Sequence, residues 1–144
     1  METLNKNRNI IKLCLLVFAM ASYKGVAQSP YEKQLIGTWE IQGTLMGDNG
    51  EGWLAPHKQA NPDCKPNHSV FTEEHVAKEV RYNQDCEAKE NTFEWELNGD
   101  TLTLSKGDRS INWLIHSIED DKMTVGVQVR PKSENRMYVV YKKQ

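Results

Sequence analysis

The sequence predicts an all-β fold, an eight-stranded antiparallel up-and-down barrel with a short N-terminal helix. From Trp39 onward, most segments carry apolar side chains at every second position, which is typical of strands with one buried face. Short turns separate these segments, so each strand is expected to pair with the one before it. A sheet with one continuous apolar face hides that face most economically by curling and closing on itself.

Residues 1–27 are expected to be a cleaved signal peptide, and residues 28–144 to form the barrel domain. Basic residues flank the apolar run 13–21, and a short polar stretch follows it, which is the pattern of a secretory signal. Small side chains allow cleavage after Ala21 or after Ala27, and we expect the second because it leaves a polar region before the cut. An uncleaved membrane anchor is the alternative, although the apolar run is too short to span a bilayer.

The composition excludes several classes of function. The chain of 144 residues has 18 basic and 20 acidic side chains, and removal of the signal peptide would increase the acidic excess. Nucleic acid is not an expected partner, because a basic surplus is needed to neutralise a phosphate backbone. The length fits one domain. We expect an exported monomer, in the periplasm or secreted to the external medium, with no stable membrane insertion.

Cys64 and Cys86 are expected to form a disulfide. They are the two cysteines of the mature chain, and export would place them in an oxidising compartment where disulfides persist. The alternative is a pair of free thiols. The third cysteine, Cys14, lies inside the apolar run of the signal peptide and not at its end, so no lipid anchor is expected.

The first elements of the mature chain are a short helix and a strand. Ser29, with Pro30 after it and Glu32 three positions later, matches a capping box that opens a helix. Gly37 is expected to end this helix. The strand that follows is expected to bury one face, formed by Trp39, Ile41 and Leu45.

The middle of the chain is the hardest part to interpret. Residues 53–67 carry three prolines and little periodicity, which indicates a long surface loop. Residues 72–82 fit a helix capped by Thr72, but they also alternate as a strand does. We expect a hairpin that turns at Glu73 and Glu74. One face of its second strand would then carry Val76, Lys78, Val80 and Tyr82.

The strand pattern is clearest after Cys86. Asn98-Gly99 between two alternating runs is a strong signal of a tight hairpin. Three further strands are expected, divided by turns at 106–108, 119–121 and 131–135. The apolar faces of the last three strands are formed by Ile111, Trp113 and Ile115, by Met123, Val125, Val127 and Val129, and by Met137, Val139 and Tyr141.

Three apolar residues fall on the opposite, outer face of the barrel, namely Leu114, Tyr138 and Val140. A patch of this kind needs a cover if it is not an interaction surface. We expect the N-terminal helix, around Tyr31 and Leu35, to cover it.

Two parts of the sequence resemble the lipocalins. Gly37-Thr38-Trp39, after a short helix and at the start of the first strand, looks like the G-x-W signature of that family. The cysteine pair and the hairpin over 93–102 are similar to those of small exported lipocalin-like domains of Gram-negative bacteria. The resemblance covers roughly residues 33–142. It implies a barrel that binds or carries a small molecule.

The resemblance also implies three structural residues: Gly37, Trp39 and Arg136. Trp39 would plug the closed end of the barrel, and an arginine from a strand would stack over its ring. Arg136 is the candidate, in a cation–π contact worth about 0.5 to 2 kcal/mol. The alternative is that Arg136 begins an exposed strand and contacts only water.

An eight-stranded barrel either is filled by its own side chains or holds one small ligand, and the sequence does not decide between them. The expected inner face from Phe93 onward carries no charge, so a bound molecule should be apolar and lipid-like. The candidate ligand-binding residues are Ile41, Phe93, Trp95, Leu102, Leu104, Trp113, Ile115, Met123, Val125, Met137 and Tyr141.

Two further residues each have two interpretations. Lys78 shares the expected face of Val76 and Val80, where its ammonium would meet a ligand carboxylate inside the barrel; alternatively it lies at the rim or outside. Trp53 lies in the proline-rich loop, and it either forms part of a lid over the mouth of the barrel or packs on the outer wall.

No catalytic site, metal site or cofactor is expected. The four histidines are scattered, and no arrangement of Ser, Cys or His suggests a nucleophile with its base. His57, Cys64 and His68 lack the spacing of a zinc site. The leading hypothesis is an exported barrel that binds or carries a small apolar molecule. The rival is a filled barrel that binds another protein through its loop and edges, as an interaction or inhibitor module of the cell envelope.

Overall fold

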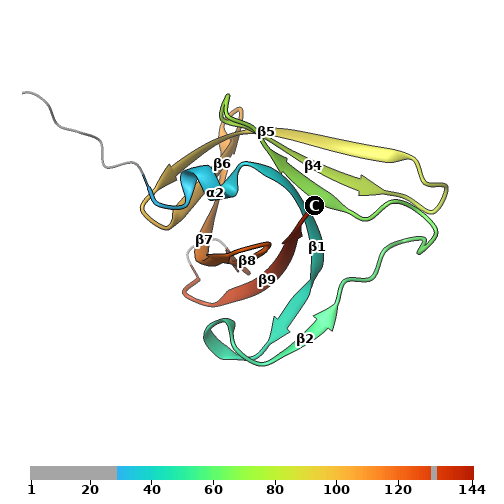
Figure 1. The fold of residues 1–144 in the computed structure, drawn as a ribbon, viewed down its shortest axis with the longest axis horizontal. Coiled ribbons are helices and arrows are strands. Elements are labelled where there is room, and N and C mark those ends of the chain that lie inside the picture. Colours follow the sequence, from blue (N-terminus) through green and yellow to red (C-terminus); the bar gives the residue numbers. More distant parts are fainter. Residues whose placement is uncertain (1–28, 131–132) are drawn as a thin grey trace, which may run out of the picture.

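The fold is a closed β-barrel with one additional strand (Figure 1). The computed structural model describes residues 29–130 and 133–144, and the expected signal peptide lies outside the described residues. The elements are α2 (Glu32–Leu35), β1 (Gly37–Met46), the 3₁₀ turn η1 (Asp48–Gly50), β2 (Trp53–Pro56), β3 (His68–Phe71), β4 (Val76–Tyr82), β5 (Ala88–Asn98), β6 (Thr101–Lys106), β7 (Arg109–Glu119), β8 (Lys122–Gln128) and β9 (Arg136–Lys143).

Eight strands, β1 and β3 to β9, close the barrel. From β3 onward each strand pairs antiparallel with its predecessor, and β9 returns to pair with β1. The predicted eight-stranded antiparallel up-and-down barrel is therefore confirmed. Residues 68–82 form the two strands β3 and β4 and not a helix, because one face of each strand contributes to the barrel core.

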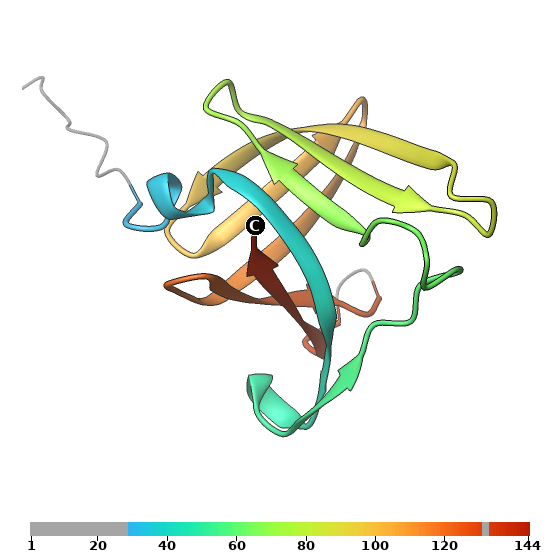
Figure 2. The ribbon, with the colours of Figure 1, turned by 45° about the vertical axis from the view of Figure 1, so that its right-hand side comes forward.

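The sequence does not predict the ninth strand, β2. Residues 53–67 are expected to be a loop, but their first four residues pair with the second half of β1. The first half of the same edge of β1 pairs with β3. β2 therefore leaves the barrel together with η1, as Figure 2 shows. A strand of four residues that ends in proline has too little alternation to be recognised from the sequence.

A β-bulge in β1 reverses the faces of that strand. Ile41 pairs with the core residue Tyr141, and the register shifts immediately after it. Beyond the shift Leu45 pairs with Tyr138, which lies on the opposite face of β9 from Tyr141. The prediction that Leu45 shares a face with Trp39 is therefore wrong, because the extra residue of a bulge inverts the alternation.

The N-terminal helix packs at the end of the barrel where β1 begins, and it does not lie against the outer face of the barrel. α2 is a single turn, and its Leu35 is fully buried in the same core cluster as Trp39. The predicted capping box does not form. The Ser29 Oγ atom accepts a 3.4 Å hydrogen bond from the Tyr31 N–H, but the reciprocal bond from the Glu32 side chain is not made. The Ser29 hydroxyl instead donates to the carbonyl oxygen of Gly99, 2.7 Å away, in the β5–β6 turn.

The turn η1 covers the outer apolar face instead. Tyr138 and Val140 are both buried although they lie outside the main core cluster. Gly50 lies so close to Tyr138 that a Cβ atom there would come within 3.1 Å of the tyrosine ring. A helix of one turn cannot reach both the barrel end and the outer wall, so the prediction that α2 covers this patch is wrong.

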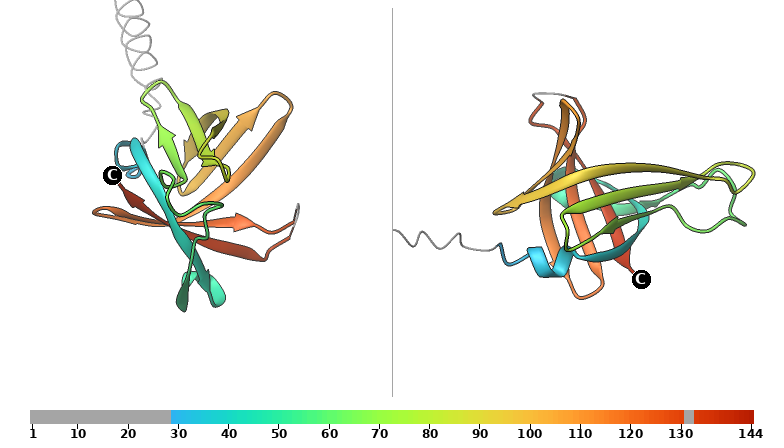
Figure 3. Two further views of the ribbon diagram at one scale, coloured as in Figure 1. Left: turned by 90° about the vertical axis from the view of Figure 1, so that its right-hand side faces the viewer. Right: turned by 90° about the horizontal axis from the view of Figure 1, so that it is seen from above.

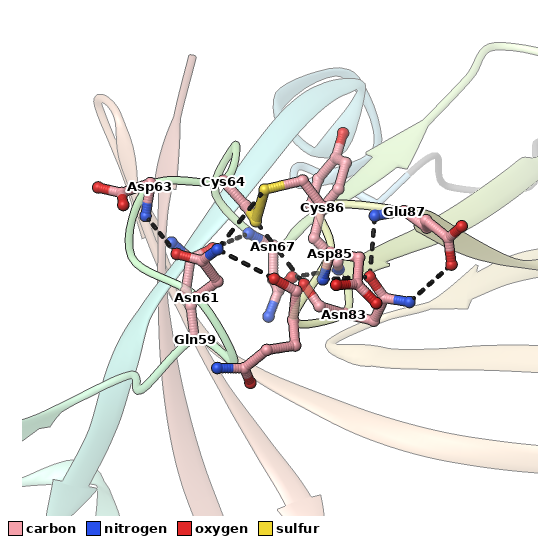
Figure 4. Close-up of a disulfide and its surroundings, with 11 residues drawn as sticks. Gln59, Asn61, Asp63, Cys64, Asn67, Asn83, Asp85, Cys86 and Glu87 are labelled. Carbon is pink, nitrogen blue, oxygen red and sulfur yellow. Dashed lines mark hydrogen bonds between the residues drawn. A yellow bond between two sulfur atoms is a disulfide. The ribbon is translucent and has the colours of Figure 1, made fainter.

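A disulfide ties the long β2–β3 connection to the turn between β4 and β5. Cys64 and Cys86 are bonded, with their Cα atoms 5.2 Å apart, as predicted. Figure 3 shows the β4–β5 hairpin and this connection extending together beyond the barrel. Around the sulfurs, Asn61 Nδ2 donates to the Gln84 carbonyl oxygen, and Asn83 Oδ1 accepts from two backbone N–H groups of its own turn (Figure 4).

Candidate functional site

The closed half of the barrel interior is filled by its own side chains. The Trp39 ring is fully buried, and its Nε1 donates a 2.7 Å hydrogen bond to the Leu35 carbonyl oxygen. Phe71 packs edge-on against Trp95 and Trp113, with ring centroids 6.3 and 6.5 Å apart. Such contacts leave no room for a guest molecule.

The structure divides the candidate ligand-binding residues into two groups. Ile41 and Phe93 are partly exposed and pack against the edge of the core, and Met137 is 46% exposed. All three lie toward the open end of the barrel. The others are buried in the core cluster: Trp95, Leu102, Leu104, Trp113, Ile115, Met123, Val125 and Tyr141.

We call the inner face of the sheet at the open end the mouth; it is formed by Ile41, Met46, Phe93, Ile111 and Met137. Strand pairing gives these residues their common face. Ile111 pairs with the core residue Leu104, and Met137 with Val127, which packs against the core. Met46 lies two positions after Thr44, which pairs with Val139. Next to the mouth lie Trp53, which pairs with Met46, and Val129, just after β8.

A polar group borders the mouth on the β3–β4 side. Tyr141 is buried on β9, and the Ser69 side chain and the charges of Glu79 and Arg81 act on its phenol. Burial, with the Glu79 charge as a smaller cause, raises the pKa of Tyr141 well above its usual value. The phenol therefore keeps its proton at physiological pH and remains a hydrogen-bond donor.

Asn67 holds together the segments that meet where β2 and β3 share the edge of β1. It is buried, and its Oδ1 accepts a 2.8 Å hydrogen bond from the Tyr82 backbone N–H. Its Nδ2 therefore faces the Nε2 atom of His57, 3.0 Å away. Its backbone N–H donates to Gln59 Oε1, and its carbonyl oxygen accepts from the N–H of Ile41.

This geometry requires His57 to be neutral. Because Asn67 Nδ2 is a donor, Nε2 of His57 must be the acceptor and cannot carry a proton. Burial lowers the pKa of His57 below the ordinary histidine value of 6.5, and the nearby positive charge of Arg81 lowers it further. Protonation would break the hydrogen bond and place two positive charges side by side.

We expect the free energy of unfolding to fall as the pH is lowered from about 7.5 to 5.5. The native pKa of His57 is depressed, so the unfolded chain binds the proton first and the stabilisation present above pH 6.5 is lost below it. The measurement is urea unfolding at several pH values. In His57→Gln, whose amide oxygen can accept the same hydrogen bond without titrating, the decline should be smaller. The matched control His68→Gln should keep the full decline of the wild-type protein. If stability declines equally in His57→Gln and in the control, the pH effect belongs to other groups.

The structure selects the outer of the two interpretations of Lys78, and it separates Arg136 from Trp39. Lys78 points outward near Glu90, with Nζ and Oε2 4.0 Å apart, because Ala77 and not Val76 is in the core. Arg136 lies at the open end of β9, where it pairs with Gln128. Trp39 opens β1 at the other end of the barrel, so no contact between the two is made.

Lys143 takes the place expected for the arginine. Its Nζ lies 5.1 Å from the centroid of the Trp39 ring and donates to the Gln34 carbonyl oxygen. Gly37 permits this crossing, since its φ is +133° and a Cβ atom there would lie 2.8 Å from Lys143 Cε. The glycine and tryptophan of the G-x-W motif thus belong to one contact, in which the glycine provides the space for the lysine.

Sequence reasoning missed Met46, Glu79, Arg81 and Asn67. Met46 is concealed by the bulge, and Glu79 and Arg81 by the choice of the Val76 face as the inner one. The small size of Ala77 is the only local signal for the correct face. Nothing in the sequence marks Asn67, since its partners lie on three separate segments.

Hollows of about 370, 400 and 410 Å³ lie on outer surfaces of the described residues. Within the same residues, no three His, Cys, Asp or Glu side chains are placed to share a metal ion. Over residues 29–130 and 133–144, the helices are too short and too polar to cross a membrane.

A family model described as a lipocalin-like domain matches residues 35–125. The matched segment contains Gly37, Trp39 and both cysteines of the disulfide, and it ends inside β8. No curated protein matches the chain.

Proposed function

The chain belongs to the lipocalin-like domain family, and from this premise we propose that it binds one small apolar, lipid-like molecule at the mouth of its barrel. The fold supports a general ligand-binding role. The disulfide indicates an oxidising environment, which supports export to the periplasm or the external medium.

The observation that carries this proposal is the set of large apolar side chains exposed at the open end. Met46 is 52% exposed, Ile111 44% and Met137 46%. Trp53 and Val129 beside them are 65% and 61% exposed. Soluble proteins scatter exposed apolar residues singly, whereas a group of them marks a binding surface.

The ligand is expected to rest on the core and not to enter it. Ile41, Phe93 and Met137 would contact it directly, whereas the buried candidates such as Trp113 would form the floor beneath it. Each 100 Å² of apolar surface that binding removes from water contributes about 2.5 kcal/mol. The two methionine side chains of the mouth, Met46 and Met137, would adapt to guests of different shape.

A binding titration with an uncharged fluorescent probe, N-phenyl-1-naphthylamine, tests the proposal. Ile111→Asp and Met137→Asp each place a charge in the mouth and should weaken binding at least tenfold, because the apolar probe would remove water from an unpaired carboxylate. Leu54→Asp is the matched control. Leu54 is 40% exposed, but it pairs with Leu45 and so lies on the opposite face of the sheet.

The outcomes separate the binding hypothesis from its rival. Failure of the wild-type protein to bind the probe, or equal loss of binding in Leu54→Asp, would overturn the proposal. The rival interaction module predicts instead that replacing residues 58–63 by a Gly/Ser segment of equal length, which keeps Trp53, Cys64 and Asn67, abolishes capture of a protein partner. The lipid content, measured by native mass spectrometry, would stay the same.

A further inference from the structure

The expectation that the inner face carries no charge from Phe93 onward is wrong, because the inner surface of the barrel becomes basic along one side of the mouth. Lys106 and Arg109 pair with each other across the β6–β7 hairpin. Lys106 lies two positions after the core residue Leu104 and therefore shares its face. Its Nζ lies 5.8 Å from the Phe93 ring centroid and donates a 3.4 Å hydrogen bond to Asn91 Oδ1.

Two more basic residues continue this face on the neighbouring strands. Ala77 and Phe93 pair with each other on the inner face. Because side chains alternate between the two faces of a strand, the next inner pairs along β4 and β5 are Glu79 with Asn91 and Arg81 with Lys89. The basic face therefore consists of Arg81, Lys89, Lys106 and Arg109, all of which are exposed. It spans the four neighbouring strands β4 to β7.

Few acidic groups balance the basic face. Glu79 lies within it, with Oε1 4.0 Å from Arg81 Nη2, and Asp108 lies in the turn between β6 and β7. Within the described residues, Lys106 and Arg109 have no carboxylate within salt-bridge distance. The other acids of β5 alternate onto the outer face, at Glu90, Glu94 and Glu96. A chain with more acidic than basic residues thus presents mainly positive charge to the mouth.

The opposite side of the mouth is apolar. Met137 on β9 and Met46 on β1 face the interior there, and Ile111 connects the two sides because it lies two positions from Arg109 on β7. One molecule could thus touch apolar side chains and free cations at the same time.

We propose that the ligand is a single-chain amphiphile with an anionic head, such as a carboxylate or a sulfonate. Lys106 and Arg109 hold the head, and the chain lies over Phe93, Ile111 and Met137. This inference rests on the proposed function and specifies its ligand. The alkyl chain of the ligand would exclude water where it lies on the barrel wall. This strengthens the attraction between the anionic head group and the cations of Lys106 and Arg109.

Displacement of N-phenyl-1-naphthylamine at pH 8 by three twelve-carbon compounds tests the inference. Dodecanoate should displace the probe at a concentration at least tenfold lower than dodecanol does, and dodecylamine should be weaker than dodecanol. High salt should reduce the advantage of dodecanoate and leave dodecanol unchanged.

A pair of double variants assigns the head-binding residues. In Lys106→Gln/Arg109→Gln, the preference for dodecanoate should fall below twofold while dodecanol binds as before, which also reports that the variant is folded. The control Lys78→Gln/Lys142→Gln removes two exposed lysines that form ion pairs away from the mouth, with Glu90 and Asp121, and should keep the full preference.

Three results would overturn parts of this account in different ways. Equal binding of dodecanoate and dodecanol would refute the anionic head and leave the apolar site intact. If neither the probe nor any of the three compounds binds, the proposed function itself is refuted. Binding to vesicles of anionic lipid, without displacement by monomeric dodecanoate, would mean that the basic face recognises a membrane surface and not a single amphiphile.

Discussion

Replacing Trp39 by alanine is expected to lower the free energy of unfolding by about 3 to 5 kcal/mol. The ring is fully buried, and removing it would leave a cavity between Leu35 and the barrel core. It would also remove the hydrogen bond from Nε1 to the Leu35 carbonyl oxygen and the contact with Lys143. Urea unfolding followed by circular dichroism measures the loss.

Trp53→Ala is the matched control for this prediction, because the same ring is deleted from a site that is 65% exposed. We expect it to change the free energy of unfolding by no more than about 0.5 kcal/mol. Equal stability of Trp39→Ala and Trp53→Ala would show that Trp39 does not form a packed plug at the closed end of the barrel. Trp39→Phe should recover part of the loss, since it keeps most of the buried area.

Removing the disulfide is expected to destabilise the protein by about 3 kcal/mol. In Cys64→Ala/Cys86→Ala, the loop between the two positions is no longer closed in the unfolded chain, so that chain gains conformational entropy. The β2–β3 connection has little secondary structure of its own and depends on this bond and on Asn67 for its position.

Amide hydrogen exchange locates this effect. The amides near the disulfide, such as that of Tyr82 at the end of β4 and that of Glu87 in the β4–β5 turn, should exchange much faster in the double variant. Those of β8 and β9, on the far side of the barrel, should follow only the global loss of stability. If neither the free energy of unfolding nor the amide exchange near Tyr82 changes, the disulfide does not anchor the β2–β3 connection to the β4–β5 hairpin.

A barrel with a filled floor and an exposed, two-sided mouth differs from a deep container. The aromatic floor removes the volume that a fully enclosed guest would need. Binding at the mouth leaves part of the guest in water, which suits a molecule with one polar end. Rapid loading and release would follow, because no strand has to move to admit the guest.

The reliability of the sequence predictions depended on how local each signal was. The Asn98-Gly99 hairpin and the strands after it were predicted because turn type and alternation are encoded within a few neighbouring residues. The inner face of β4 was not, since Val76, Val80 and Tyr82 form the more apolar set along this strand. Only pairing with Phe71 and Phe93 places Ala77, and with it Glu79 and Arg81, on the inside. The disulfide was predicted correctly from the number of cysteines and the expected compartment.

The residues of the proposed binding site were predicted only in part. The sequence supplied its apolar residues, but it did not separate Met137, which is exposed, from Met123, which is fully buried. That difference depends on distance from the plugged end of the barrel. Likewise Lys143 and not Arg136 reaches Trp39, because the antiparallel return of β9 brings the end of the chain beside the start of β1.

By itself, the sequence determined the all-β class, the order of the barrel strands and the bonded cysteines, because periodicity, turn residues and composition are properties of short segments. Only the tertiary structure decided which face of β4 is inside, where the bulge in β1 inverts the pattern, that β2 leaves the barrel, and that four basic residues share the inner face of β4 to β7. These features depend on register between strands that are far apart in the chain, and a shift of one residue exchanges the two faces of a strand.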